Sequence, residues 1–274
     1  MHRAALHSFS FNGDRKMIDS KDVKLIHGDC LTEMKLIPDA SVDMILCDLP
    51  YGTTACKWDV IIPFDKLWEQ YERIIKDNGA IVLFSGEPFT SNLIVSNIRL
   101  FRQKLTWLKT RPTNVFNAKK QFMNWTEDIC VFYKKATTFN PQMRTDGVFT
   151  GAKIQRNNHD RSNGTLGKTG EKKDYVHESN GGLFYPKSVL EFSNVHNGGT
   201  GFHPTQKPVA LLEYLIKTYT NEGETVLDNT MGSGSTGVAC IRTKRKFIGI
   251  ELNDEYFGIA QKRISQEQQQ LSLF

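Results

Sequence analysis

Short apolar runs and helical stripes alternate in the first part of the chain. Val42 to Cys47 is a continuous apolar run, which is typical of a strand covered on both faces, and Ala80 to Phe84 is another. Val23 to His27 predicts an earlier short strand. The helix expected between the two long runs ends at Asn78-Gly79. Its apolar stripe consists of Phe64, Leu67, Trp68, Tyr71, Ile74 and Ile75.

The same alternation returns near the C-terminus. Strands are expected at Glu224 to Leu227 and at Lys246 to Ile250, with a helix between them and a last helix beginning near Asn253. A helical stripe precedes them, formed by Val209, Leu212, Leu215, Ile216 and Tyr219. Strand–helix–strand alternation of this kind predicts an α/β fold with a doubly wound, mostly parallel sheet.

The segment between these halves has a different character. Residues 137–202 hold ten of the 21 glycines and few apolar residues, so we expect an insertion in which Leu183 to Phe192 is strand-like. The expected organisation is therefore a main domain with one insertion and two short ends. Its parts are a loose arm (1–20), the main domain (21–136 and 203–266), the insertion (137–202) and a tail (267–274).

Composition narrows the class of protein. The chain has 274 residues, and nothing in it approaches 18 consecutive apolar residues, so no membrane span is expected. The five cysteines form no CxxC pair, which is typical of reduced thiols in a cytoplasmic protein. The seven histidines show no metal-binding spacing, so no metal site is expected.

Charge is unevenly distributed. Residues 99–173 contain sixteen Lys and Arg against five Asp and Glu, a net charge of +11, while the whole chain carries only +5. A basic middle on an acidic body indicates a polyanionic partner more strongly than the overall charge does. The alternative is an ordinary solvated surface, and charge alone does not separate the two.

A glycine-rich loop follows the first C-terminal strand. Residues 232–237 (GSGSTG) fit the GxGxxG pattern of dinucleotide folds, in which the first glycine follows the strand almost at once. Here Asp228 and three further residues intervene, and a carboxylate at the strand tip repels a pyrophosphate but pairs with an ammonium group. An NAD-dependent oxidoreductase is therefore only an alternative. No lysine follows the glycines, which excludes a P-loop.

A second carboxylate supports a different cofactor. Glu251 lies at the tip of the next expected strand, where an acidic side chain can accept hydrogen bonds from both hydroxyl groups of a ribose. Together with Asp228 and the glycine loop, it fits a cofactor with an amino-acid end and an adenosine but no phosphate. S-adenosylmethionine meets that description. The alternative is that both carboxylates merely cap helices.

The tetrapeptide Asp48-Leu49-Pro50-Tyr51 follows the run Val42 to Cys47. The lone pair of an exocyclic amino nitrogen is conjugated into its base, and an acceptor for the amino hydrogens helps to rehybridise it. Asp48 and the backbone carbonyl of Leu49 or Pro50 can be such acceptors, Pro50 fixes the turn, and Tyr51 offers a face for stacking. The base must leave its duplex to reach this pocket. An ordinary strand-end turn is the alternative.

From Val23 to Ile264 the chain resembles the β group of amino-methylating DNA methyltransferases, whose N6-adenine members usually carry Asp-Pro-Pro-Tyr. The order is that of the group: target-base motif at 48–51, recognition insertion, then cofactor loop at 228–237. Further matching segments are Gly28-Asp29-Cys30, residues 203–208 (HPTQKP) and residues 247–251 (FIGIE). Two departures are Leu49 in place of a proline and Asn229-Thr230-Met231 where Pro-Phe-x is commoner.

The resemblance implies a methyltransferase-type sheet and a role for each motif. Asp29 would accept a hydrogen bond from the cofactor adenine, Glu251 would hold the ribose, and Lys207 would lie near the methionine carboxylate. A helix cap for Asp29 and a surface position for Lys207 are the alternatives. The catalytic residues implied are Asp48, Leu49, Pro50 and Tyr51. The cofactor-binding residues implied are Asp29, Cys30, Thr205, Lys207, Asp228, Asn229, Met231, Gly232, Ser233, Gly234 and Glu251.

The basic window fits DNA as the partner. Cations there alternate with aromatic side chains, so phosphates can meet the former and unstacked bases the latter. Trp107 is expected in the core. The DNA-binding residues predicted are Lys109, Arg111, Lys119, Lys120 and Trp125. Members of this group often pair, so a homodimer is open as well.

The sequence therefore predicts a DNA methyltransferase that methylates N6 of a flipped adenine. Asp48 rather than serine favours adenine, because the cytosine enzymes that the chain resembles mostly carry Ser-Pro-Pro-Tyr. The alternatives are cytosine N4 methylation and a DNA-binding relative that has lost catalysis. RNA and protein substrates are also conceivable, but amino-methylating enzymes for those usually place the cofactor loop first.

Overall fold

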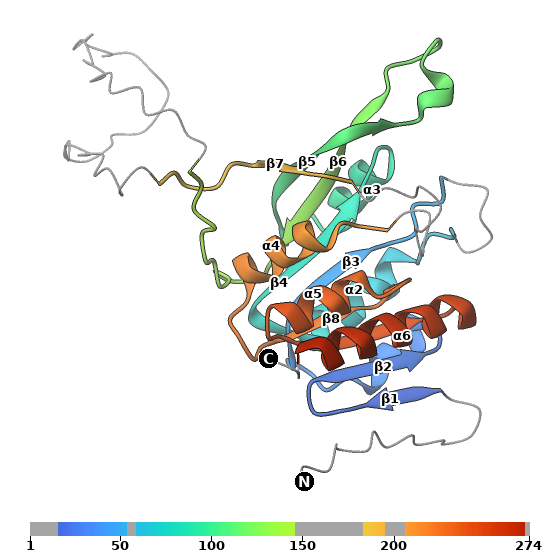
Figure 1. The fold of residues 1–274 in the computed structure, drawn as a ribbon, viewed down its shortest axis with the longest axis vertical. Helices are drawn as coiled ribbons and strands as arrows, with labels where there is room; N and C mark the ends of the chain where they lie inside the picture. The colour runs from blue at the N-terminus through green and yellow to red at the C-terminus, as the bar shows by residue number, and fades with distance from the viewer. Residues whose placement is uncertain (1–15, 54–58, 146–182, 195–205, 272–274) are drawn as a thin grey trace, which may run out of the picture. The chain divides into compact units, whose positions relative to one another are not determined.

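The computed structural model describes residues 16–53, 59–145, 183–194 and 206–271. Within these ranges, nine strands form one sheet in the order β1-β2-β9-β8-β3-β4-β6-β5-β7 (Figure 1). The strands are β1 (Met17–Asp19), β2 (Val23–His27), β3 (Val42–Asp48), β4 (Ile75–Ser85), β5 (Phe101–Thr113), β6 (Asn124–Phe132), β7 (Val189–Phe192), β8 (Thr225–Asp228) and β9 (Lys246–Glu251).

The centre of the sheet is parallel. β2, β9, β8, β3 and β4 pair in parallel, whereas β1 and β6 run antiparallel to their neighbours and β7 is parallel to β5. From β3 the chain moves to β4 on one side, and from β8 it moves to β9 on the other. The strand order therefore reverses between β3 and β8, and in open α/β sheets ligands bind at such a point.

Helices cover both faces of this sheet, so the predicted doubly wound α/β class is confirmed. Leu46 and Val82 pack with α4, α5 and α6, while their neighbours Ile45 and Leu83 pack with α1, α2 and α3. This alternation follows the two-residue period of a strand. The helices are α1 (Cys30–Glu33), α2 (Phe64–Ile74), α3 (Phe89–Ser96), α4 (Val209–Tyr219), α5 (Ser235–Arg242) and α6 (Asp254–Leu271), with 3₁₀ turns η1 (Met34–Leu36) and η2 (Val115–Asn117).

The predicted end of the first long helix at Asn78-Gly79 is wrong. The helix α2 ends at Ile74, and Ile75 already pairs with Val42 on the neighbouring strand. Burial of Ile75 and its pairing outweigh the local turn signal. Residues 76–79 instead form a bulge in β4, where Gly79 is required because a Cβ atom would lie 2.8 Å from the Asp43 carbonyl oxygen.

Three expected boundaries also differ from the structure. Within the expected arm, residues 17–19 form β1, because Met17 and Ile18 each reach one of the two cores. The expected tail begins inside α6, whose last turns are held where Arg242 forms an ion pair with Glu267 at 2.8 Å. In the expected insertion, only Val189 to Phe192 of the strand-like stretch is a strand, and it joins the main sheet beside β5.

The chain divides into two compact units. One contains residues 1–140 and 187–274, and the other contains residues 141–186. The described part of the second unit includes one antiparallel bridge, between Arg144 and Phe184. Among the helices of the described residues, none has both the length and the apolar character that a membrane crossing requires.

Candidate active site

One cavity of about 800 Å³ opens at the carboxyl ends of β2, β9, β8 and β3. Asp48 ends β3 and Asp228 ends β8, and both line this cavity although they are 180 positions apart. The two strands are neighbours, with Met44 paired to Val226. The sheet order thus brings the two predicted motifs together at the point of strand reversal.

Asp228 is a buried carboxylate in a polar cradle. Its side chain is 4% exposed and accepts hydrogen bonds from the Thr236 hydroxyl at 2.6 Å and from the Thr230 backbone N–H at 3.1 Å. Burial raises the pKa of Asp228 to about 7, against the lowering effect of those two hydrogen bonds, and the nearby Asp48 charge raises it further. A bound cation would relieve this unfavourable charge.

The glycine loop bends closely around the same cavity. Gly232 and Gly234 adopt φ values of +51° and +79°, which glycine reaches without steric cost. A Cβ atom on Gly234 would also lie 2.9 Å from Cβ of Ala260 on α6. The Arg263 guanidinium donates to the Ser233 carbonyl oxygen at 2.5 Å. The loop is therefore held in one shape, with α6 packed behind it.

Glu251 faces the cavity from the end of β9. Its carboxylate accepts from the backbone N–H groups of Gly232 at 2.9 Å and Asn253 at 2.7 Å. Burial raises the pKa of Glu251, and these hydrogen bonds partly offset the shift. Asp29 lines the same wall, and it also caps α1 by accepting from the Thr32 N–H at 3.0 Å. Asp29 therefore both caps helix α1 and lines the cavity.

Asn229 fixes the loop to the sheet. Its Oδ1 accepts from the Cys47 thiol at 2.9 Å and from the Tyr71 hydroxyl at 2.5 Å. The next residue, Thr230, donates its hydroxyl to the Asp48 carbonyl oxygen at 3.1 Å. At the positions where the sequence departs from Pro-Phe-x, polar bonds therefore join the two strand ends. The sequence places Tyr71 on an apolar helical stripe and offers no signal for this role.

Asp48 is the centre of a charged cluster at the other side of the cavity. Its Oδ1 accepts from the Tyr51 hydroxyl at 2.8 Å, and its Oδ2 lies 2.5 Å from Nζ of Lys207. The same ammonium group is 3.4 Å from Glu127 on β6. Burial lowers the pKa of Lys207, but the two carboxylates outweigh burial and raise it overall.

Tyr51 stacks against Phe89, with ring centroids 5.0 Å apart. Burial and then the charges of Asp48 and Glu127 raise its pKa well above the usual value, so the phenol stays protonated and donates to Asp48. Glu127 was not predicted as a site residue. The only signal for it in the sequence is its position as an acidic residue next to a long basic run. Leu49, which stands where a proline is usual, is buried in the core cluster against which Tyr51 packs.

The cavity is thus acidic at the end formed by Asp228 and Glu251, and it carries an ordered hydrogen-bond acceptor, Asp48, at the other. A family model described as DNA methylase matches residues 42–262, which include every one of these strand ends except that of β2. The chain belongs to this DNA methylase family. The family resemblance predicted from the sequence is therefore confirmed.

Individual relatives of this DNA methylase support the assignment. It is 31% identical over 255 residues to DNA adenine methyltransferase YhdJ of Escherichia coli (strain K12), covering 88% of this chain and 82% of that protein. It is 30% identical over 264 residues to the type II methyltransferase M.HpaI of Haemophilus parainfluenzae, covering 90% of this chain and 75% of that protein.

Solved structures show the same fold. The M1.HpyAVI–SAM complex matches with a TM-score of 0.58 and 25% identity over 88% of this chain and 99% of that one. The PvuII DNA methyltransferase (cytosine-N4-specific) matches with a TM-score of 0.61 and 16% identity over 92% of this chain and 93% of that one. The family depends on S-adenosylmethionine, so the predicted cofactor is confirmed.

The donor set of the methylase fits this cofactor. Two carboxylates, Asp228 and Glu251, line one end of the cavity without a lysine or arginine among the described lining residues there, which suits an ammonium group and a ribose rather than phosphates. The predicted Thr205 lies outside the described residues. Lys207 contacts Asp48, and its predicted position beside a methionine carboxylate stays a prediction.

The predicted DNA-binding residues of the methylase fall into two groups. Lys109 is 8% exposed, 3.7 Å from Glu127 and over the ring of buried Trp107, so it faces inward, and its predicted DNA contact stays a prediction. It points inward because residues alternate between the faces of β5. Arg111, Lys119, Lys120 and Trp125 are exposed on the β5–β6 hairpin.

We expect Lys207→Met to lower the free energy of unfolding of the methylase by about 1–3 kcal/mol, because two partly buried carboxylates lose their shared cation. Urea denaturation measures the change. Lys104→Met is the matched control: its ammonium group binds Asp128 at 3.1 Å but is 42% exposed, so an effect under about 1 kcal/mol is expected. Equal losses in the two variants would contradict the cluster's importance.

Proposed function

We propose that this DNA methylase transfers a methyl group to N6 of an adenine that has been extruded from its duplex. The observation that carries the proposal is the shared cavity, in which Asp48 with its tyrosine lies opposite Asp228 with its glycine loop. The name of the adenine-methylating relative at 31% identity supports adenine over cytosine. DNA is the substrate that the family implies.

The residues around Asp48 prepare the amino group. The Asp48 carboxylate accepts a hydrogen bond from it and so favours a pyramidal nitrogen whose lone pair points across the cavity. Tyr51, held by Phe89 and Asp48, offers its ring to the base. The amino nitrogen forms the new N–C bond, the methyl–sulfur bond breaks with its electron pair staying on sulfur, and one amino proton leaves to water.

The opposite side of the cavity holds the cofactor, which supplies an electrophilic methyl group on a sulfonium. Asp228 binds its ammonium group, and the buried carboxylate gains a partner for its charge. Glu251 accepts from the ribose hydroxyls, and Asp29 accepts from the adenine amino group. The glycine loop, fixed by Asn229 and Arg263, forms the wall of the cavity on this side.

The test is transfer of a labelled methyl group from S-adenosylmethionine to unmethylated DNA by the full chain, followed by digestion to nucleosides. The expected product is labelled N6-methyl-2′-deoxyadenosine. N4-methylcytosine would overturn the base assignment, and an unlabelled product would overturn the enzymatic activity in favour of a DNA-binding relative. Sequencing of the modified DNA identifies the methylated site.

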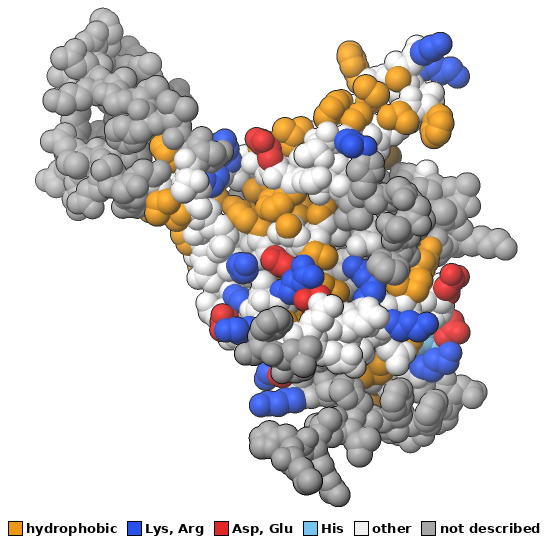
Figure 2. Space-filling view, in the orientation of Figure 1, with side chains coloured by type: hydrophobic (Ala, Val, Ile, Leu, Met, Phe, Trp, Pro, Cys, Tyr) orange, Lys and Arg blue, Asp and Glu red, His pale blue; other side chains and the backbone are white. Residues whose placement is uncertain are grey.

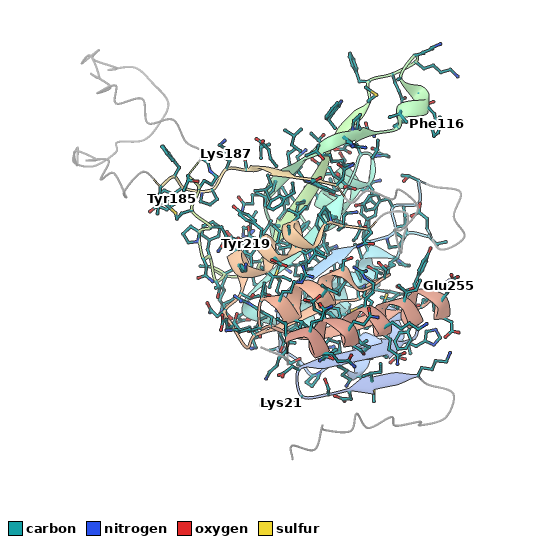
Figure 3. The ribbon with its side chains drawn as sticks, in the orientation of Figure 1. Lys21, Phe116, Tyr185, Lys187, Tyr219 and Glu255 are labelled. Atoms are coloured by element: carbon teal, nitrogen blue, oxygen red, sulfur yellow. The ribbon has the colours of Figure 1, made fainter. Side chains whose placement is uncertain are left out.

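The exposed cations give a second expected result. Replacing Arg111, Lys119 and Lys120 with Gln should reduce the slope of log binding constant against log salt concentration by about 0.9 for each phosphate that the variant no longer neutralises. Gln at Lys21 and Lys35 is the matched control, because both are exposed and Lys21 lies beside β1 at the opposite edge of the sheet (Figure 3). A slope that falls equally in the control would remove the hairpin from the interface.

A further inference from the structure

The β5–β6 hairpin extends beyond the rest of the sheet (Figure 1). Its last strand pair is Thr113 with Asn124, and residues 114–123 form the connecting loop. Phe116 lies at this far end (Figure 3). No residue of the loop belongs to either apolar core, so the loop's side chains are not there to stabilise the fold.

Two aromatic side chains on this loop are almost fully exposed. Phe116 is 100% exposed and Phe122 is 98% exposed, which is unusual for phenylalanine. They are not isolated, because Val115, Met123 and Trp125 are also exposed on the same hairpin. Exposed apolar side chains gathered on one projection mark a binding surface rather than ordinary surface variation.

The loop has a defined shape that presents these rings. The Asn117 carbonyl oxygen accepts from the backbone N–H groups of Lys120 at 2.8 Å and Gln121 at 3.0 Å, and the Asn117 amide donates to Asn114 Oδ1 at 2.7 Å. Asn114 adopts φ +66°, which asparagine tolerates better than most residues. The two phenylalanines are therefore held on an ordered turn, which lowers the entropy lost when they bind a partner.

Charge selects the partner. From Thr110 to Thr126 there are three basic residues, Arg111, Lys119 and Lys120, and no acidic one. Figure 2 shows hydrophobic and basic side chains together on the projecting hairpin. Cations meet phosphates and aromatic rings stack on bases, so this mixture fits nucleic acid better than an apolar protein surface.

The hairpin also continues directly from the active-site cavity. Glu127 on β6 lines the cavity, and Trp125 lies on the same strand face two residues nearer the hairpin end. Phe122 is five residues from Glu127, which at about 3.3 Å per extended residue is at most about 16 Å along the chain. A two-stranded ribbon of this kind fits the major groove of DNA, and apolar side chains inserted between base steps unstack them.

We infer that Phe116 and Phe122 stack on DNA bases next to the extruded adenine and stabilise the opened duplex. Arg111, Lys119 and Lys120 hold the flanking phosphates. This inference rests on the proposed function, because it takes the base in the cavity to come from the same duplex. The hairpin thus favours extrusion itself, in addition to adding affinity for DNA.

The test compares Phe116→Ala/Phe122→Ala with the unaltered chain on two synthetic duplexes. Both carry the methylated site found by sequencing, and one has a mismatched base opposite the target adenine, which reduces the cost of extrusion. We expect kcat/KM on the paired duplex to fall by about 10- to 100-fold. On the mismatched duplex it should stay within about threefold of the unaltered enzyme.

Three controls separate the outcomes. Val95→Ala/Ile98→Ala removes two exposed apolar side chains elsewhere and should leave both substrates unaffected. S-adenosylmethionine binding and the salt slope of the phenylalanine variant should be unchanged, and Phe116→Tyr/Phe122→Tyr should retain activity. Equal loss on both duplexes, no loss on either, or a change of oligomeric state with full activity would overturn the inference. An unaltered chain without transfer activity would instead overturn the proposed function.

Discussion

Asp48→Asn is expected to lower the rate of methyl transfer by about 100- to 1000-fold, the usual cost of losing a preorganised electrostatic contact to the reacting centre. The side chain keeps its shape, so the amide oxygen can still accept from Lys207 or from Tyr51. It no longer presents a charged acceptor on both oxygens, and the target amino group therefore loses the partner that aims its lone pair.

Binding measurements distinguish this effect from damage to the fold. Asp48→Asn should bind S-adenosylmethionine within about threefold of the unaltered affinity, because Asp228 and Glu251 are intact. Loss of a charge-assisted hydrogen bond to the cofactor would change the affinity by far more than threefold. Asp128→Asn is the matched control: Asp128 on β6 is also bound to a lysine, Lys104, but it does not line the cavity. Similar rate losses in both variants would contradict the role of Asp48.

Asp228→Asn is expected to weaken S-adenosylmethionine binding by about 10- to 150-fold, which corresponds to the 1.5–3 kcal/mol of a hydrogen bond to a charged group. Asparagine fits the site, because its oxygen can accept from Thr230 and its amide can donate to the Thr236 hydroxyl oxygen. The ammonium group of the cofactor would then meet a neutral partner. Calorimetric titration measures the loss.

The affinity for S-adenosylmethionine should also depend on pH through the ionisation of Asp228. Since the pKa of Asp228 is raised to about 7, the ionised form needed by an ammonium group is lost as pH falls below 7. Affinity should therefore fall about tenfold for each pH unit below that value. Asp228→Asn should show no such dependence between pH 6 and 8. A carboxylate at another place in the fold, Asp43→Asn, should leave both affinity and its pH profile unchanged.

Stability should move in the opposite direction to binding. The folded-state pKa of Asp228 lies above its unfolded value of about 4, so the folded state binds the extra proton between these values. Its stabilising contribution is full below about pH 4 and is lost as pH rises through about 7. At pH 8, without cofactor, Asp228→Asn should unfold at higher urea concentration than the unaltered chain, by up to about 4 kcal/mol in free energy. A less stable variant would contradict the unfavourable burial of the Asp228 charge.

The sequence predicted the elements that depend on local pattern. The apolar run at Val42, the helical stripe at Leu212 and the glycine loop after Asp228 all correspond to structure, because burial on a strand or helix imposes its period on the chain. The family order of motifs then placed Asp48 and Asp228 in one site. Both are strand-end residues, and parallel strands present such ends at one edge.

Contacts between distant segments account for what the sequence did not predict. Ile75 leaves its helical stripe because Val42 offers a strand partner, and residues 17–19 become a strand only through pairing with β2. Glu127 and Lys207 are 80 positions apart, so nothing local marks them as an ion pair beside Asp48. The inward position of Lys109 was not predicted, because a run of charge does not reveal which face of a strand each residue occupies.

A crystal structure of the full chain with its DNA site and a nonreactive analogue of S-adenosylmethionine tests the central claim most directly. The extruded adenine is expected to have its amino nitrogen within hydrogen-bond distance of Asp48, while the analogue's ammonium group contacts Asp228 in the same cavity. An analogue bound away from Asp228, or a target base held in a different pocket from Asp48, would contradict the shared site.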